Sequence, residues 1–146
     1  METLKFQYHD GGRLQAGYKG KAGDCVTRAI AIVAELPYQQ VYDMVNEFSL
    51  TEKTGKRKRG VSNARTGVYK DTIKKVMLSL GFEWIPTMHI GQGCKVHLRA
   101  DELPTGRILV NVSKHSVAVI DHILHDTYDC TRGGNRCVYG YYQKKA

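Results

Sequence analysis

A cysteine stands where the sequence predicts the start of a helix. In AGDCVTRAIAIV, residues 22–33, Cys25 directly follows Asp24, and small apolar residues then recur at helical spacing. Because Asp is a residue type that caps helices, Cys25 falls in the first turn. Backbone N–H groups there are unpaired and the helix dipole favours negative charge, so a thiolate is stabilised. This is the position of a nucleophile; the alternative is a buried cysteine that only fills space.

A cysteine nucleophile needs a base, and His115 is the best placed of the six histidines. It opens the apolar run HSVAVID, residues 115–121. We therefore expect its ring at the end of a sheet, where the N-terminus of a helix can pack against it. The alternative is a polar residue that merely caps a strand.

A third group must orient the base, and the hairpin after His115 supplies a carboxylate. Residues 117–126, VAVIDHILHD, read as two apolar strands that turn at Asp121 and His122. With a turn of two residues, Asp126 shares a face with His115 on its diagonal, at about 7 Å or less between Cβ atoms. A turn of odd length changes the face. The other candidates are His125 or Thr127 with an odd turn, and Asp129 in reserve.

Three short segments carry a resemblance to a known superfamily. They are GDC at 23–25, KHSVAVID at 114–121 and HDTYD at 125–129. In this order they resemble the papain-like cysteine peptidases, particularly small uncharacterised phage and bacterial members. The resemblance implies a papain-like fold, with Cys25 as nucleophile, His115 as general base and acid, and Asp126 orienting the imidazole.

The oxyanion site departs from that pattern. Papain-like enzymes usually place a glutamine a few residues before the nucleophile, but here Lys19 stands six residues before Cys25 and Gln15 stands ten before it. The backbone N–H of Cys25 supplies one donor, and Gln15 ranks first for the second, ahead of Tyr18 and Lys19. Losing one donor costs about a hundredfold or more in rate, so a catalytically silent member of the superfamily is the alternative.

The elements that must position these residues change in character along the chain. Helical periodicity predicts helices within residues 22–33, 36–48 and 66–81. From Phe82 onward short β-rich runs predict strands, and helices followed by strands indicate an α+β fold with helices packed on a mostly antiparallel sheet. The predicted strands lie within residues 82–88, 94–98, 107–113, 115–121, 122–129 and 136–143.

Length and composition predict one globular domain over residues 1–146. The chain is 42% hydrophobic and 25% charged, and it contains neither a signal peptide nor an apolar run of the roughly 20 residues that span a membrane. We therefore expect a cytoplasmic protein whose four cysteines stay reduced. The sequence has no phosphate loop or dinucleotide motif, so no cofactor is expected.

Positive charge is concentrated in one segment. The net charge is +8, and KTGKRKRG, residues 53–60, holds five basic side chains and no acidic or apolar ones. This segment predicts a mobile loop over about residues 51–63; it is either a solvated loop or a contact for nucleic acid or an acidic substrate. Next to it, Asn63 and Arg65 either bind an acidic group in the cleft or form a capped loop.

Zinc binding is another interpretation of the remaining three cysteines. Cys94 and His97 form a C-x-x-H pair that Cys130 and Cys137 could complete, but the spacing matches a structural zinc site only in part. The alternative is that Cys94 and Cys137 pack in the core and Cys130 ends a strand. No metal is expected.

These residues predict a thiol hydrolase, a cysteine peptidase or amidase that acts on a protein or peptide and forms an acyl-enzyme on Cys25. The alternative is a catalytically silent papain-like module of a phage or bacterium that binds a host protein or nucleic acid through its basic loop. The sequence does not predict the oligomeric state.

Overall fold

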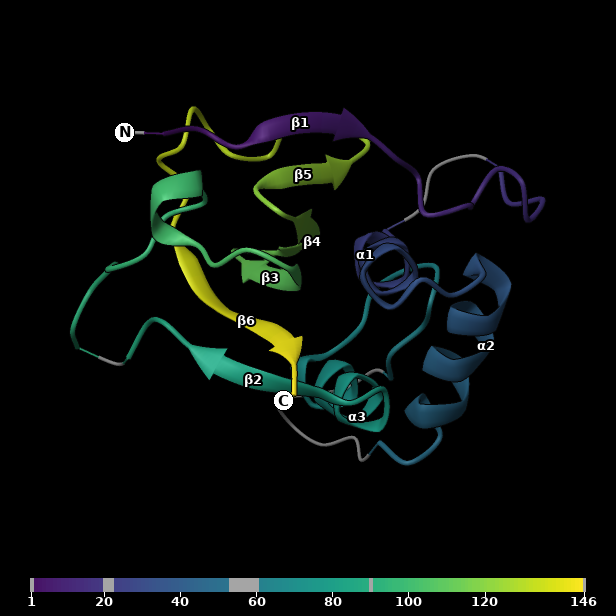
Figure 1. Ribbon diagram of the computed structural model, residues 1–146. Coiled ribbons are helices and arrows are strands. Elements are labelled where there is room, and N and C mark those ends of the chain that lie inside the picture. Colours follow the sequence, from purple (N-terminus) through teal and green to yellow (C-terminus); the bar gives the residue numbers. More distant parts are fainter. Residues whose placement is uncertain (1, 20–22, 53–60, 90, 146) are drawn as a thin grey trace.

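The computed structural model describes residues 2–19, 23–52, 61–89 and 91–145, and in these ranges it has three α-helices and six strands (Figure 1). The predicted α+β class is confirmed. In chain order the elements are β1 (Lys5–Tyr8), α1 (Cys25–Ala34), α2 (Tyr38–Ser49), α3 (Lys70–Ser79), β2 (Phe82–Pro86), the short 3-10 helix η1 (Ala100–Glu102), β3 (Arg107–Val112), β4 (His115–Ile120), β5 (Ile123–Asp126) and β6 (Val138–Lys144).

The strands form one sheet in the order β1-β5-β4-β3-β6-β2. Every pairing is antiparallel except that of β1 with β5, so the mostly antiparallel sheet is also confirmed. Strand β1 was not expected; its four residues are all exposed, although Lys5, Phe6, Gln7 and Tyr8 alternate polar and aromatic side chains. Residues 94–98 were expected as a strand, but only His97 pairs there, in an isolated bridge with Cys137.

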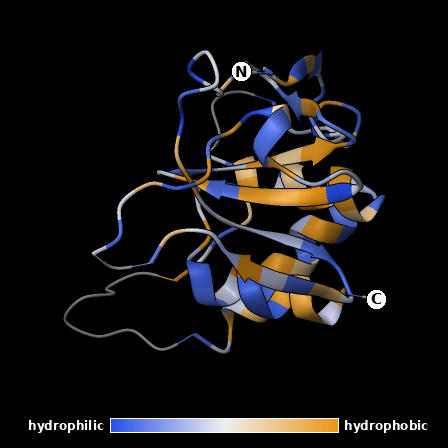
Figure 2. Ribbon diagram, turned by 60° about the vertical axis from the view of Figure 1, so that its left-hand side comes forward, coloured by the Kyte–Doolittle hydropathy of each residue, from blue (hydrophilic) through white to orange (hydrophobic). Residues whose placement is uncertain are grey.

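The helices lie together on one face of the sheet, with α1 directly against the middle strands (Figure 1). Side chains alternate between the two faces of each strand. In β3, Leu109 faces the helices, whereas Ile108 and Val110 face a second core on the other side. The segment that carries η1 covers this second core through Leu98, Ala100 and Leu103. Figure 2 shows the resulting concentration of apolar residues in the central strands.

Helix α1 is buried almost all round, because it lies between the sheet, α2 and the loop before α3. Every residue from Val26 to Val33 is buried, and Ile30 is fully buried. A buried Val or Ile side chain contributes about 1.5–3 kcal/mol, so this helix is anchored firmly. Its N-terminal residue, Cys25, is held in place accordingly.

Two cysteines are joined by a disulfide. Cys94 and Cys137 form this bond, whereas Cys25 and Cys130 are free. The expectation that all four cysteines stay reduced is therefore wrong for one pair. The bond joins the loop before η1 to the residue that precedes β6. These two segments are 43 residues apart in sequence but lie next to each other in the fold.

The sequence predicted no membrane-spanning helix and a mobile basic loop. In the described part of the chain no helix is long and apolar enough to cross a membrane. Residues 53–60, the basic segment, lie outside the described residues, so the prediction of a mobile loop over about residues 51–63 stays a prediction.

Candidate active site

Cys25 is the first residue of α1, as the sequence predicts. Asp24 occupies the capping position, but its side chain does not cap the helix. The carboxylate instead accepts hydrogen bonds from the Tyr38 hydroxyl at 2.6 Å, from Nη1 of Arg13 at 3.1 Å and from Nη1 of Arg28. Since the first N–H groups of a helix have no partner within it, those of the first turn are left free for a bound group.

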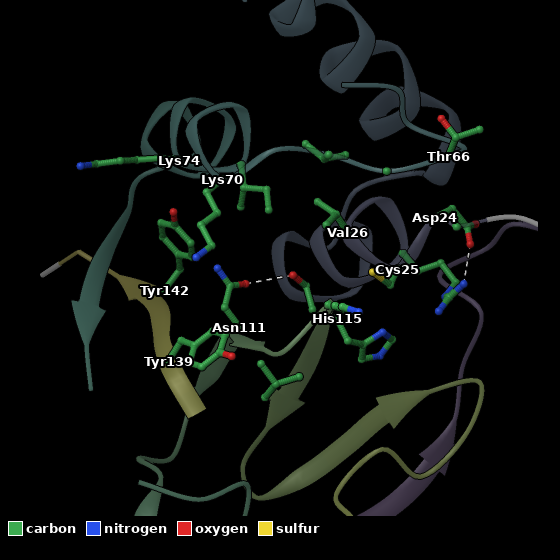
Figure 3. Close-up of a pocket in the computed structure, with 18 of the residues that line it drawn as sticks. Asp24, Cys25, Val26, Thr66, Lys70, Lys74, Asn111, His115, Tyr139 and Tyr142 are labelled. Carbon is green, nitrogen blue, oxygen red and sulfur yellow. Dashed lines mark hydrogen bonds and ion pairs between the residues drawn. The ribbon is translucent and has the colours of Figure 1, made fainter. Parts of the chain in front are cut away.

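The thiol of Cys25 lies beside the imidazole of His115 (Figure 3), and each group shifts the pKa of the other. His115 is the first residue of β4, and Figure 3 shows its side chain next to Cys25. Its Nε2 atom lies 2.6 Å from Oδ2 of Asp126, which leaves Nδ1 as the ring nitrogen available to a thiol. The backbone of Ser116 also helps to lower the pKa of this thiol. The structure thus brings the three predicted residues together.

The turn between β4 and β5 decides which carboxylate reaches His115. Ile120 pairs with Ile123, so the turn has two residues, as predicted. Both turn residues, Asp121 and His122, have positive φ, at 48° and 66°, which is the geometry of the tight hairpin turn that suits the twist of the strands. This register puts Asp126 on the face of His115.

The other candidates for this position lie elsewhere. Asp129 is exposed, and its carboxylate accepts hydrogen bonds from the backbone N–H and the hydroxyl of Thr131. The ring of His125 faces that of His9, with 5.9 Å between the centroids.

Burial and neighbouring charges have opposite effects on the pKa values of Cys25, His115 and Asp126. Burial raises the pKa of the Cys25 thiol, but the hydrogen bond and charge of His115, with smaller contributions from Ser116 and Arg28, outweigh it, so the pKa lies below its ordinary value. Burial likewise disfavours a charged His115, yet the hydrogen bond to Asp126 holds its pKa well above the usual range. The pKa of Asp126 is lowered, because its hydrogen bond to His115 outweighs its burial. These shifts favour a thiolate beside an imidazolium.

Arg28 supports this arrangement and was not identified from the sequence. It is 7% exposed; its Nη2 atom lies 3.3 Å from Oδ1 of Asp126, and its Nη1 atom bonds to Asp24. One guanidinium therefore joins the start of α1 to the carboxylate that holds His115. The signal in the sequence is an arginine inside an apolar helical run, where a cation stays only with partners.

Cys130 is a second free thiol at His115. It is 2% exposed, and its sulfur lies within 4.8 Å of the imidazole. The donor atoms of His115, Asp126 and Cys130 all lie within 4.8 Å of one another, which makes these side chains a candidate metal site. A zinc ion about 2.0–2.2 Å from each ligand would hold the nitrogen and oxygen farther apart than the observed 2.6 Å. That spacing fits a hydrogen bond and not a pair of metal ligands.

The four-residue zinc site that was considered as an alternative does not form among the described residues. Cys94 and Cys137 are joined to each other, while Cys130 is buried against His115. The alternative interpretation is also wrong for Cys94, which is exposed and does not pack in the core.

A pocket of about 910 Å³ opens beside Cys25 (Figure 3). Its walls come from the start of α1, from α3 and the loop before it, and from strands β2, β3, β4 and β6. The loop fits closely, since a Cβ at Gly23 would lie 2.9 Å from the carbonyl oxygen of Thr66. Aromatic side chains line the pocket at Trp84, Tyr128, Tyr139 and Tyr142.

Three predicted site residues lie outside this pocket. Gln15 is on an exposed turn and is not among the lining residues, so the structure does not bring it to Cys25. Asn63 accepts the backbone N–H of Arg65 at 2.8 Å. Arg65 bonds to the carbonyl oxygen of Lys19, and its guanidinium lies over the ring of Tyr18. Asn63 and Arg65 therefore shape the loop at the pocket and do not line the pocket itself.

Comparisons of the chain with models of protein families, with curated proteins and with solved structures give no match. The papain-like resemblance therefore stays a prediction from the sequence. The class that the structure itself defines is an α+β protein with a cysteine, a histidine and an aspartate in contact at one end of its sheet.

Proposed function

We propose that the chain is a thiol hydrolase of papain-like type, a cysteine peptidase or amidase that acts on a protein or peptide. The observation that carries the proposal is the contact series from Cys25 to His115 to Asp126 at the mouth of a pocket. A nucleophile bonded to a base, which a third group orients, is the arrangement that covalent catalysis requires.

The proposed reaction proceeds in two halves. The thiolate of Cys25 attacks the carbonyl carbon of the substrate, and the protonated His115 then gives its proton to the departing amine, so that the C–N bond breaks and an acyl-enzyme remains. A water molecule next attacks the thioester carbon while His115 takes its proton. The C–S bond breaks, the acid leaves, and the thiolate and imidazolium are restored.

The open start of α1 supports the charge that develops on the substrate oxygen. Because Asp24 is held by Arg13, Arg28 and Tyr38, its carboxylate does not occupy the helix end. The backbone N–H groups of the first turn, beginning with that of Cys25, serve as donors to the oxyanion. In this proposal they replace Gln15.

The cytoplasmic location stays a prediction. A disulfide such as that between Cys94 and Cys137 is rare in cytosolic proteins, where thiols are kept reduced. The chemistry at Cys25 does not depend on this bond, since neither of its cysteines lines the pocket.

The rate at which Cys25 is alkylated tests the proposal. Selective labelling alone is uninformative, because Cys130 is buried and the other two cysteines are bonded to each other. We therefore compare the rate constant for iodoacetamide at pH 6 in three samples: the wild-type protein, the His115→Ala variant, and a free peptide with the sequence of residues 23–28.

The expected result is that the wild-type protein reacts faster than both controls at pH 6. Its thiolate persists there, whereas an ordinary thiol, with a pKa of about 8.5, is almost fully protonated. A wild-type rate equal to that of His115→Ala would contradict the proposal. It would instead favour the catalytically silent binding module.

A further inference from the structure

Asn111 carries an unused hydrogen-bond donor into the pocket. This residue of β3 is 8% exposed, and its Oδ1 atom accepts the hydroxyl of Ser116 at 2.9 Å. Its Nδ2 atom has no partner among the described residues. In Figure 3 this nitrogen points away from Ser116 and towards Lys70. A donor that is accessible from the pocket and unused within the described residues is free to bind an acceptor group of a ligand.

Lys70 supplies a second donor beside it. Its ammonium lies 5.5 Å from the centre of the Tyr139 ring and forms no ion pair with any described residue. In Figure 3 the Lys70 side chain extends towards Asn111, whereas Lys74, one turn later on α3, extends in a different direction. Two donors, one of them charged, thus face the same region.

Aromatic residues next to these donors, Trp84 and Tyr142, pack against each other and form one wall of the pocket. Trp84 of β2 lies against Tyr142 of β6, with 4.9 Å between the ring centroids. The indole also covers Gly140, where a Cβ would lie only 2.4 Å from its ring atoms. A residue with any side chain at that position would displace Trp84, so this glycine lets the ring lie flat against the sheet.

The other charged side chains around the pocket leave an excess of positive charge. Arg13 and Arg28 are neutralised by Asp24 and Asp126. Three lysines and one acidic residue remain without an ion pair among the described residues: Lys70, Lys74, Lys114 and Asp71. Asp71 lies near the Tyr142 hydroxyl, because it contributes to raising the pKa of that group. The net charge of these four remaining side chains is positive.

We propose that the pocket selects acyl donors with a carboxylate, which binds between the ammonium of Lys70 and the amide of Asn111 while the rest of the side chain packs on the aromatic wall. The proposal rests on the proposed function, because it takes Cys25 as the group that is acylated. The carboxylate belongs either to an acidic side chain on the acyl side of the reacting bond or to the terminus of the leaving portion.

Peptide thioesters test this preference. One Glu is moved through the four positions before the thioester carbon, and each peptide is compared with its Gln counterpart; a second pair carries a free or amidated carboxyl group on the leaving portion. The rate at which Cys25 is acylated is followed by intact mass. We expect one carboxylate position to be preferred about tenfold over its neutral counterpart, equivalent to about 1.4 kcal/mol. The position that shows the preference identifies the source of the carboxylate.

Variants assign the preference to its residues. Lys70→Gln should abolish it, and Lys70→Glu should reverse it in favour of a Lys-bearing peptide. Asn111→Asp keeps an acceptor for Ser116 but adds a negative charge, so it should disfavour the carboxylate. Lys75→Gln is the matched control, because Lys75 lies on the same helix outside the pocket and donates to Thr51 at 2.9 Å. It should keep the full preference.

Equal rates for every Glu and Gln pair would overturn the proposal, as would a preference that survives in Lys70→Gln. The iodoacetamide rate of each variant at pH 6 is measured alongside. If that rate stays high while the preference is absent, only the carboxylate site fails. If the rate falls to that of an ordinary thiol in the wild-type protein, the proposed function fails first.

Discussion

Nε2 of His115 and Oδ2 of Asp126 lie 2.6 Å apart across a hairpin whose turn contains only two residues. Two adjacent strands therefore fix the imidazole without help from a flexible loop. The thiol reaches the same ring from a separate element, the start of α1. A buried helix and a short hairpin together determine the geometry of the site.

Removing Asp126 should impair acylation of Cys25 less than removing His115. In the proposed mechanism His115 transfers protons, whereas Asp126 only fixes the tautomer and supports the charge of the ring. His115→Ala should lower the rate about a hundredfold or more, and Asp126→Ala by less. Asp126→Asn should recover part of the loss, because the amide oxygen still accepts from the imidazole.

Asp129→Ala is the matched control for this series, since its carboxylate bonds to Thr131 and not to His115. Acylation by a peptide thioester, measured by intact mass on variants shown to be folded by circular dichroism, checks the order. Loss of acylation in Asp129→Ala but not in Asp126→Ala would mean that the wrong carboxylate was chosen.

Alkylation of Cys25 should depend only weakly on pH between 6 and 8. The pKa of the thiol is lowered and that of His115 is raised, so the thiolate and imidazolium persist below the ordinary pKa of a cysteine, about 8.5. In His115→Ala this support is lost, and the rate should fall about tenfold for each pH unit below that value. Rate constants for iodoacetamide across this pH range give the two profiles. Parallel profiles would show that His115 does not lower the thiol pKa.

Arg28→Met should destabilise the protein by about 3–5 kcal/mol, because it leaves the carboxylates of Asp24 and Asp126 buried without their shared cation. Combining it with Asp24→Asn should restore part of the loss, since one of the two charges is then removed. Urea unfolding of the single and double variants measures both effects. A single variant as stable as the wild-type protein would show that Arg28 is not needed to neutralise this cluster.

The disulfide should stabilise the fold by about 4 kcal/mol, the amount that chain entropy predicts for cysteines 43 residues apart. Replacing Cys94 and Cys137 together with Ser should lower the free energy of unfolding by about this amount while leaving the alkylation rate of Cys25 unchanged. Intact mass before and after reduction shows whether the bond is present. A protein whose mass does not increase on reduction has no such bond.

Local sequence patterns, helical periodicity and the alternation of strands, predicted the parts of the fold that depend on contacts between residues close in sequence. Helix α1, the strands on either side of Asp121 and His122, and the contact of His115 with Asp126 all follow from periodicity and from one turn. Alternation of faces then placed two side chains together without any knowledge of the rest of the chain.

Long-range contacts explain what the sequence did not predict. Strand β1 joins the sheet edge through a parallel pairing with β5, although its own residues are all exposed. Arg28 contacts Asp126, which lies 98 residues further along the chain. Gln15 was predicted as an oxyanion donor because it is a glutamine ahead of Cys25, but the turn that carries it does not line the pocket. Each of these features depends on how segments far apart in the sequence lie in space.

The most direct test of the central claim is the time course of the intact mass after the protein is mixed with a peptide thioester. The account predicts that wild-type protein first gains the mass of the acyl group at Cys25 and then returns to its free mass as the acid is released, whereas His115→Ala acylates slowly and does not release the acid. The account would be contradicted if no adduct formed at Cys25, or if His115→Ala gained and lost the acyl group at the wild-type rates.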